Sequence, residues 1–199
     1  VFQTGSGTSS NMNANEVIAS LASRGAKKPV HANDQVNMGQ SSNDVVPTAI
    51  QVAAVLACRE QLLPSIKHLR ATLDRRAKSL GKVTKTGRTH LMDAMPLTLA
   101  QELGTWSAQL ASAGERIEDS LGRLRRLPIG GTAVGTGINA DPRFGKLVAA
   151  ALSKLSGTKF EQAKNLFEGI ASQDASVELS GQVNVLAVAL MRIGNELRW

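Results

Sequence analysis

The sequence predicts an all-α protein made of long helices. Apolar residues recur every three or four positions over two stretches of thirty-odd residues and again near the end of the chain, whereas no segment has a convincing strand pattern. Helices of that size are roughly 45–55 Å long at 1.5 Å per residue. A chain of 199 residues is small for such helices. We therefore expect helices from other subunits to cover their apolar faces.

Composition excludes several classes of protein. The formal net charge is +7, but the chain has two Trp, four Phe and no Tyr, too few for a nucleic-acid stacking platform. No apolar run of 18 or more residues is free of charged and polar groups, so no membrane span is expected. No cluster of His, Cys, Asp and Glu has metal-ligand spacing, so no metal is expected. Cys58 lies within a helical run and is interpreted as a buried apolar group.

The first part of the chain is predicted to be mostly polar and irregular. Residues 1–10 are rich in Gly, Ser and Thr and predict a loop, residues 11–22 predict a short helix, and residues 24–43 contain several helix breakers. We expect residues 1–42 to be the end of an N-terminal domain that carries a substrate-binding loop and the short helix. Residues 43–199 are expected to form a central domain of long helices.

The first long helix is predicted over residues 44–80. Asn43 or Asp44 can cap its start, and Pro47 is tolerated because the first turn needs no amide donor. Pro64 lies inside the helix and is expected to kink it. Gly81 is expected to end it as a C-terminal cap.

Three further helices follow in the same periodic pattern. A connection over residues 82–96 leads to the second long helix, predicted over residues 97–127. The glycine-dense segment 130–137 is interpreted as a tight turn, because it has neither a Gly-Lys-Ser/Thr sequence nor a preceding strand that would predict a phosphate loop. A shorter helix is predicted over residues 144–155, and the last begins near Asp174. The apolar face predicted for this last helix consists of Val177, Leu179, Val183, Leu186, Leu190 and Ile193.

Two polar segments concentrate groups that can hold a carboxylate. In Ser6-Gly7-Thr8 two hydroxyls flank a glycine, which lets the backbone approach a ligand closely. Ser41-Ser42-Asn43 repeats the pattern at the predicted start of the first long helix, where free N–H groups favour anions. A plain loop explains the first segment equally well, and helix capping explains one residue of the second.

A histidine supplies the group that can move a proton near neutral pH. His90 follows Thr89 in the segment Gly87-Arg88-Thr89-His90, between two predicted helices. His31, in the segment His31-Ala32-Asn33-Asp34, is a second candidate. A lone histidine is more often structural than catalytic, and both interpretations stay open at this point.

Four motifs occur in an order that resembles the class II fumarases (fumarate hydratases) of the aspartase/fumarase superfamily. The resemblance covers essentially the whole chain, and within the superfamily Gly-Arg-Thr-His is the fumarase form. Aspartases usually carry another residue at the position of His90 and Thr at the position of Ser42. The four motifs are Thr4-Gly-Ser-Gly-Thr-Ser-Ser-Asn-Met-Asn13, Gln40-Ser-Ser-Asn-Asp44 with Pro47-Thr48-Ala49, Gly87-Arg-Thr-His-Leu-Met-Asp93 and Gly131-Thr-Ala-Val-Gly-Thr-Gly137.

The resemblance implies reversible hydration of fumarate to (S)-malate, a reaction of the tricarboxylic acid cycle. It also implies a homotetramer whose long helices form one bundle, with each active site drawn from three subunits, and no metal or organic cofactor. The reaction removes a proton from the carbon beside one carboxylate, develops charge on that carboxylate as an aci-carboxylate, and expels hydroxide with a proton from a general acid. A cytoplasmic protein is expected, or a mitochondrial matrix protein in a eukaryote.

The resemblance also assigns roles to residues of this chain. His90 matches the active-site histidine that handles a proton, and Thr89 matches a substrate-binding position. A second dicarboxylate site is implied at His31, Ala32, Asn33 and Asp34; the family often has Pro where Ala32 stands, which puts the rigidity of that site in doubt. The remaining substrate-binding positions are Ser6, Gly7, Thr8, Ser41, Ser42 and Asn43.

Both ends of the chain are interpreted as cut. The family's flexible signature loop, which carries the serine thought to be the carbon base, is expected beyond Trp199, so this piece alone is predicted to be inactive. Two alternatives to fumarase remain open. One is a sibling lyase of the aspartate ammonia-lyase type; the other is a basic helical scaffold that binds nucleic acid.

Overall fold

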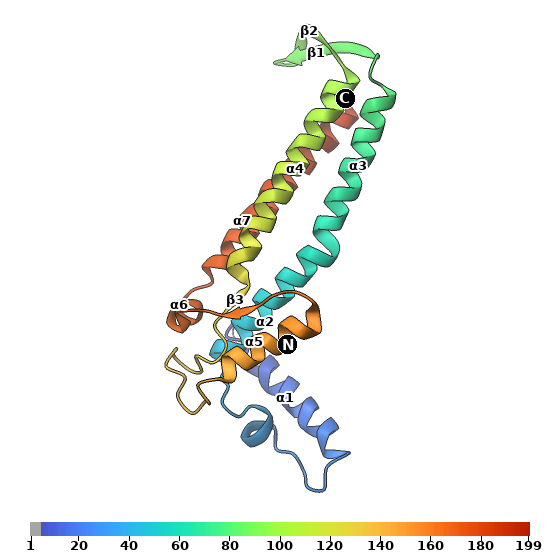
Figure 1. Ribbon diagram of the computed structural model, residues 1–199. Helices are drawn as coiled ribbons and strands as arrows, with labels where there is room; N and C mark the ends of the chain where they lie inside the picture. Colours follow the sequence, from blue (N-terminus) through green and yellow to red (C-terminus); the bar gives the residue numbers. More distant parts are fainter. Residues whose placement is uncertain (1–4) are drawn as a thin grey trace. The chain divides into compact units, whose positions relative to one another are not determined.

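The computed structural model describes residues 5–199, and it is predominantly helical (Figure 1). Thr4, the first residue of one predicted motif, lies outside the described residues. The described part of the chain forms two compact units. The first comprises the described residues up to Leu56 together with Gly122–Val177, and the second comprises Ala57–Leu121 and Glu178–Trp199. The predicted domain division between residues 42 and 43 stays a prediction.

The elements follow the predicted helices closely, with additions. The helices are α1 (Thr8–Ser23), η1 (Ala32–Val36), α2 (Ser42–Ala57), η2 (Cys58–Leu62), α3 (Leu63–Ser79), α4 (Leu99–Leu124), α5 (Phe144–Ser156), α6 (Leu166–Ala171) and α7 (Asp174–Arg198), of which η1 and η2 are π-helical. The strands are β1 (Thr84–Thr89), β2 (Met92–Thr98), β3 (Arg126–Leu127) and β4 (Glu161–Gln162).

The predicted first long helix is divided into three consecutive segments, α2, η2 and α3. In η2 the hydrogen bonding widens, so that the Leu63 N–H donates to the carbonyl of Cys58 five residues earlier. This irregularity directly precedes Pro64, which has no N–H for the regular ladder. Pro47 lies beyond the first turn of α2, because the helix begins at Ser42. The explanation that Pro47 stands where no donor is needed was therefore wrong.

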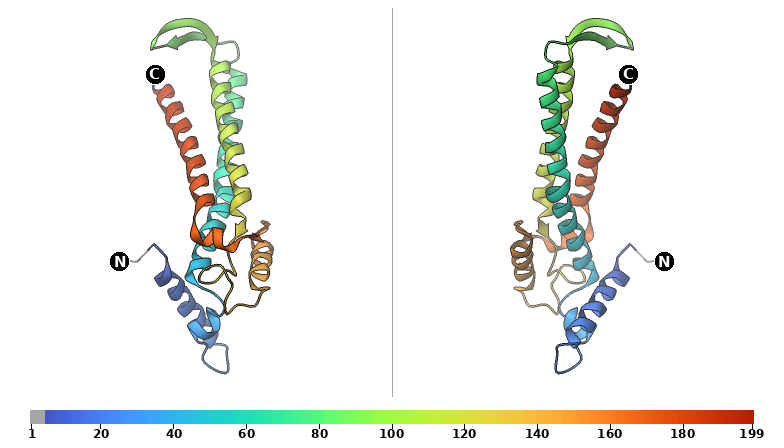
Figure 2. Two further views of the ribbon diagram at one scale, coloured as in Figure 1. Left: turned by 90° about the vertical axis from the view of Figure 1, so that its left-hand side faces the viewer. Right: turned by 90° about the vertical axis from the view of Figure 1, so that its right-hand side faces the viewer.

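The second unit is held together by one apolar stripe on α4. Trp106, Leu110, Ala113, Ile117 and Leu121 recur at helical spacing and are all buried. Figure 2 shows α3 and α4 side by side within this unit, with α7 inclined to them and diverging toward its C-terminal end. Ile66 of α3 and Leu179, Leu186 and Ile193 of α7 are the buried residues that these helices add. Cys58 is buried as predicted.

The apolar face predicted for α7 was only partly right. Leu179, Leu186 and Ile193 are buried, but Val177, Val183 and Leu190 remain 68%, 38% and 40% exposed. The buried residues repeat every seven positions, so one narrow stripe packs inside the unit and the adjacent apolar residues stay uncovered. Among the described helices, α7 alone is long and apolar enough to cross a membrane, a test that a core helix of a soluble protein also passes.

The predicted all-α class is confirmed by the predominantly helical fold, but the short strands that it contains were not predicted. Residues 84–98 form an antiparallel β-hairpin, β1–β2, in which Thr84 pairs with Thr98 and Thr89 pairs with Met92. In the first unit, β3 and β4 form a two-residue parallel pair. The predicted connection over residues 82–96 is therefore an ordered arm.

Candidate functional site

Three hydroxyl groups meet where two helices of the first unit begin. Thr8 starts α1 and Ser42 starts α2, and Thr8 Oγ1 lies 3.1 Å from Ser42 Oγ. Ser6 Oγ lies 3.3 Å from Thr8 Oγ1. The hydroxyls lie at helix N-termini, where the helix dipole favours an anion. Two segments that were predicted separately thus form one polar cluster.

Gly7 makes this close approach possible. Its backbone is left-handed, with φ of 70°, and a Cβ placed there would lie 2.8 Å from Cγ2 of Val46. A side chain at this position would have to push α1 away from α2 and would adopt a strained backbone. The helix α1 begins at Thr8, three residues earlier than predicted, so Thr8 belongs to the helix and not to the preceding loop.

The start of α2 is fixed by a reciprocal pair of hydrogen bonds. Ser41 Oγ accepts the Asn43 N–H at 3.1 Å, and Asp44 Oδ1 accepts the Ser41 N–H at 3.0 Å. This arrangement resembles a capping box, except that the Ser41 hydroxyl accepts the N–H of the second helical residue, Asn43, while the third, Asp44, accepts the N–H of Ser41. Ser41 is therefore the cap, whereas Asn43 or Asp44 had been predicted. Asn43 instead donates its side-chain amide to the carbonyl of Ala133 at 2.7 Å.

Asp44 also reaches the glycine-rich loop. Its Oδ2 accepts the backbone N–H groups of Gly130 at 3.0 Å and Thr132 at 2.9 Å. The residue has no exposed surface. Burial raises the pKa of the Asp44 carboxyl, and the N–H groups of Thr132, Ser41 and Gly130 oppose that rise. The loop over residues 130–137, predicted as a tight turn, is therefore fastened to the start of α2.

Asp44 is the residue whose importance the sequence prediction missed, because it was considered only as a helix cap. A signal was present in the spacing. Asp44 lies three, four, seven and eleven positions before Pro47, Thr48, Gln51 and Val55, and all five are buried on one face of α2. An acid at a core position of an amphipathic helix needs internal donors, since burying an unpaired charge is costly.

Thr89 and His90 lie in the second unit, at the turn of the β1–β2 hairpin. His90 and Leu91 are the two central residues of the turn, and both have left-handed backbone, with φ of 51° and 63°. Positive φ at both positions is the pattern of a type I′ turn. Gly87 occupies a bulge between Thr86 and Arg88, where a Cβ would lie 2.5 Å from the Met95 carbonyl oxygen. The turn presents Thr89 and His90 to solvent as exposed side chains.

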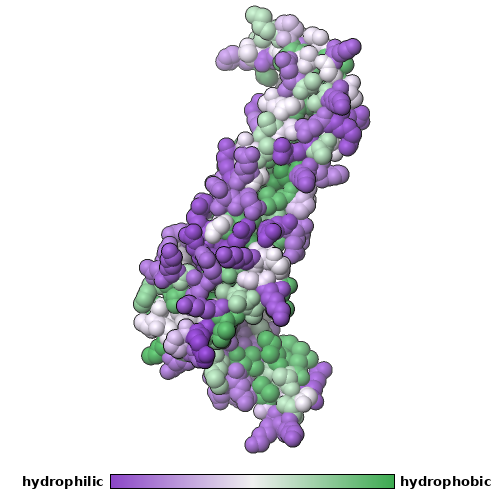
Figure 3. All heavy atoms as spheres, viewed as in Figure 1, coloured by the Kyte–Doolittle hydropathy of each residue, from purple (hydrophilic) through white to green (hydrophobic). Residues whose placement is uncertain are grey.

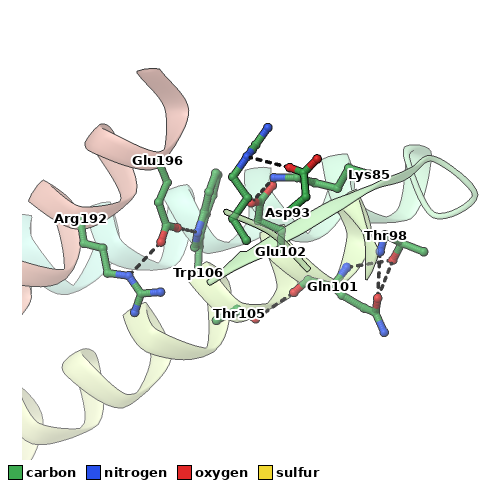
Figure 4. Close-up of polar contacts among 10 residues, drawn as sticks. Lys85, Asp93, Thr98, Gln101, Glu102, Thr105, Trp106, Arg192 and Glu196 are labelled. Carbon is green, nitrogen blue, oxygen red and sulfur yellow. Dashed lines mark hydrogen bonds and ion pairs between the residues drawn. The ribbon is translucent and has the colours of Figure 1, made fainter. Parts of the chain in front are cut away.

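The hairpin is anchored to α4 by a partly buried ion pair. Lys85 Nζ lies 2.5 Å from Glu102 Oε1 (Figure 4). The Leu99 N–H donates to the carbonyl of Val83 at the base of the hairpin. Further along α4, Trp106 Nε1 donates to Glu196 of α7 at 2.5 Å. An open depression of about 350 Å³ on the hairpin is lined by none of the predicted site residues.

The predicted second site lies on η1 and is exposed, apart from the partly buried Ala32. His31 Nδ1 accepts the Asp34 N–H at 3.2 Å, and Gln35 Oε1 accepts the His31 N–H at 2.7 Å. The side chains of His31 and Gln35 thus accept backbone N–H groups at the start of η1. His31, Ala32, Asn33 and Asp34 are thus contiguous at one helix start, and Ala32 is the first residue of the π-helical turn. A dicarboxylate site here stays a prediction.

The helical fold and the hydroxyl cluster at the helix starts agree with a comparison with known families. The model of the lyase family matches residues 1–199. The chain therefore belongs to the lyase family.

Individual relatives carry a more specific name. Over all 199 residues the chain is 66% identical to "Fumarate hydratase class II" of Xylella fastidiosa and 53% identical to "Fumarate hydratase class II 2" of Pseudomonas aeruginosa. It covers 42% and 43% of those proteins, so it spans less than half of their length. The crystal structure of class II fumarase from Schistosoma mansoni aligns with 98% of this chain, which covers 45% of the fumarase chain. The TM-score is 0.94 and the sequence identity is 39%.

Proposed function

We propose that the protein to which this chain belongs is a fumarate hydratase, which interconverts fumarate and (S)-malate. The observation that carries the proposal is the 66% identity, over every residue of the chain, to a protein named fumarate hydratase class II. The chemistry of the site is consistent with it. Hydroxyl groups and helix N-termini suit the carboxylates of a small dicarboxylic acid.

In this proposal Ser6, Thr8 and Ser42 donate to the substrate carboxylates. Gly7 permits their close approach, and Ser41 and Asn43 set the backbone from which Ser42 projects. These donors stabilise the charge that develops on one carboxylate as the carbon-bound proton is removed. Substrate contacts by these residues, and by Thr89, are part of the proposal.

His90 acts as the proton-handling group at the oxygen. In the hydration direction it accepts a proton from the attacking water, and in the reverse direction it returns that proton to the leaving hydroxide. We propose that the hydroxyl cluster of one protomer meets Thr89 and His90 of another. The carbon base is assigned by the resemblance to the flexible signature loop.

A substrate test separates hydratase from ammonia-lyase activity. We expect the protein as its gene encodes it to produce fumarate from (S)-malate, measured by the ultraviolet absorbance of fumarate, and to leave aspartate unchanged. The same preparation should show no salt-dependent affinity for nucleic acid. Fumarate from aspartate alone would replace the proposal with the ammonia-lyase alternative.

A homotetramer is the second part of the proposal. An isolated two-stranded hairpin is marginally stable in water, yet β1–β2 leaves Leu91, Met92 and Met95 between 70% and 81% exposed. Val17, Ile18 and Leu21 form a second exposed apolar group on α1, and Figure 3 shows apolar side chains gathered over that helix. Groups of this kind mark interfaces. Sedimentation equilibrium of the gene-encoded protein is expected to give four times the monomer mass, and a monomer at micromolar concentration would contradict it.

The proposed location is the cytoplasm, or the mitochondrial matrix if the source is a eukaryote. Bacterial relatives named fumarate hydratase support a soluble protein. The apolar helix α7 is weak support for a membrane span, since Leu179, Leu186 and Ile193 pack inside the second unit.

A further inference from the structure

The carboxylate of Asp44 joins two segments that are far apart in the sequence. One oxygen accepts the Ser41 N–H, and the other accepts the N–H groups of Gly130 and Thr132, which are 86 and 88 residues away. Helix capping accounts for the first contact only. The second oxygen has no role in starting α2 and is committed to the loop over residues 130–137.

An ionised carboxylate is the side chain that suits this position. Three backbone N–H groups converge on it, and a carboxylate accepts hydrogen bonds with both oxygens and donates none. An amide of the same shape would turn an NH₂ group toward at least one of those N–H groups. Asp44 has no exposed surface, so a backbone N–H left without its acceptor at this position is costly.

The contacts of Asp44 reach the hydroxyl cluster through one residue. Ser42 lies between Ser41, whose N–H Asp44 accepts, and Asn43, whose side chain donates to the carbonyl of Ala133 in the loop. Ser42 Oγ in turn lies 3.1 Å from Thr8 Oγ1. The orientation of Ser42 therefore depends on how the loop is held against α2.

We propose that Asp44 is a positioning residue of the dicarboxylate site: it locks the loop over residues 130–137 onto the start of α2 and thereby sets the direction of Ser42 and Asn43. This inference rests on the proposed function. In this proposal Asp44 does not touch the substrate, because it has no exposed surface and both of its carboxylate oxygens accept backbone N–H groups. Its contribution is to hold the donors of the cluster at fixed positions before the substrate arrives.

The variant Asp44→Asn tests the inference in the gene-encoded protein. It keeps the size of the side chain but can satisfy either Ser41 or the loop. We expect the KM for malate to rise by about tenfold to a hundredfold. A displacement of about 1 Å in the groups that position a substrate can lower catalytic efficiency by as much as a hundredfold. We expect kcat, corrected for the folded fraction, to fall by less than KM rises. Hydrogen exchange of the backbone in residues 130–137 should become faster.

Ser153→Ala is the matched control. Ser153 Oγ accepts the backbone N–H of Phe160 at 2.8 Å in the same unit and so fastens the segment that follows α5 to that helix. Its loss should speed exchange near Phe160 and leave KM within about twofold, because distant sites act independently. Asp44→Glu keeps an acceptor-only group on a longer side chain and should give a KM between those of the wild type and Asp44→Asn.

The outcomes separate failure of the inference from failure of the proposed function. A wild-type protein without fumarate or malate turnover would end the proposed function. Wild-type turnover, with an unchanged KM in Asp44→Asn and only a lower melting temperature, would overturn the inference. Exchange of the wild-type protein is decisive even if both Asp44 variants fail to fold. The amides of Ser41, Gly130 and Thr132 should be equally protected and should gain protection together when malate is added, whereas free exchange at Gly130 and Thr132 would refute the lock.

Discussion

Replacing His90 with asparagine is expected to lower kcat for malate dehydration by about a hundredfold to ten-thousandfold, the usual contribution of one general acid or base. Asparagine can hydrogen-bond in the same place but cannot exchange a proton near neutral pH. His90 is exposed at the hairpin turn and has left-handed backbone, which asparagine tolerates, so the variant should fold with a melting temperature equal to or slightly above that of the wild type. Initial rates of fumarate formation, measured by absorbance in the gene-encoded protein, give kcat and KM.

The contrast with Ser42→Ala makes this result specific. Removing that hydroxyl takes away a proposed substrate donor and leaves the proton-handling group in place, so KM should rise more than kcat falls. If His90→Asn retained the wild-type kcat, the proton step would belong to another group. The assignment of His90 would then be wrong, although the substrate-binding assignments would be unaffected.

Replacing Leu110 with alanine is expected to destabilise the protein by about 2–5 kcal/mol, the range for large-to-small changes in a packed core. Leu110 has no exposed surface and lies in the middle of the buried stripe of α4. The change removes apolar contacts and leaves a cavity that straight, packed helices cannot easily fill. Chemical denaturation, with the midpoint and slope followed by circular dichroism, measures the loss.

Leu155→Ala is the control for that experiment. It makes the same chemical change at the end of α5, where the side chain is 85% exposed, and it should alter stability by less than about 0.5 kcal/mol. Equal losses at the two positions would mean that burial of the α4 stripe is not what stabilises the second unit. Activity of the Leu110 variant, measured well below its melting temperature, should stay close to that of the wild type.

Periodicity predicted the long helices well because their packing is regular. The predicted helix over residues 144–155 corresponds to α5 at Phe144–Ser156, and the predicted start near Asp174 is the first residue of α7. Each of these helices presents apolar residues at intervals of three and four, which is a local signal. The uncovered residues of α7, Val183 and Leu190, could not be separated from the buried ones by the same pattern.

The hairpin could not be predicted from a strand pattern. Both faces of β1 and β2 are largely exposed, so the sequence does not alternate between apolar and polar residues. The turn is His90-Leu91 and not the Asn-Gly pair that normally predicts it, and Pro96 lies inside β2. The β1–β2 hairpin is held by contacts to α4, such as the ion pair between Lys85 and Glu102. These contacts join residues that are distant in the sequence.

The sequence predicted which residue types make up the candidate site. It did not predict which of those residues contact one another. Hydroxyls at two helix starts indicated a carboxylate site, and Thr8 and Ser42 are indeed neighbours. The contact of Asp44 with Gly130 and Thr132 depends on tertiary packing and leaves no local signature beyond an acid on an apolar helix face. Substrate binding by these residues stays a proposal.

The hairpin turn limits how this protein can be engineered for heat tolerance. Left-handed backbone costs most residues roughly 1–2 kcal/mol, and His90 and Leu91 both adopt it. Asparagine tolerates that conformation, but at Leu91 it would also remove an exposed apolar side chain from the proposed subunit interface. At the neighbouring position the proposed reaction requires an imidazole, so a substitution at this tip sets thermostability against the proposed assembly at one position and against the proposed reaction at the other.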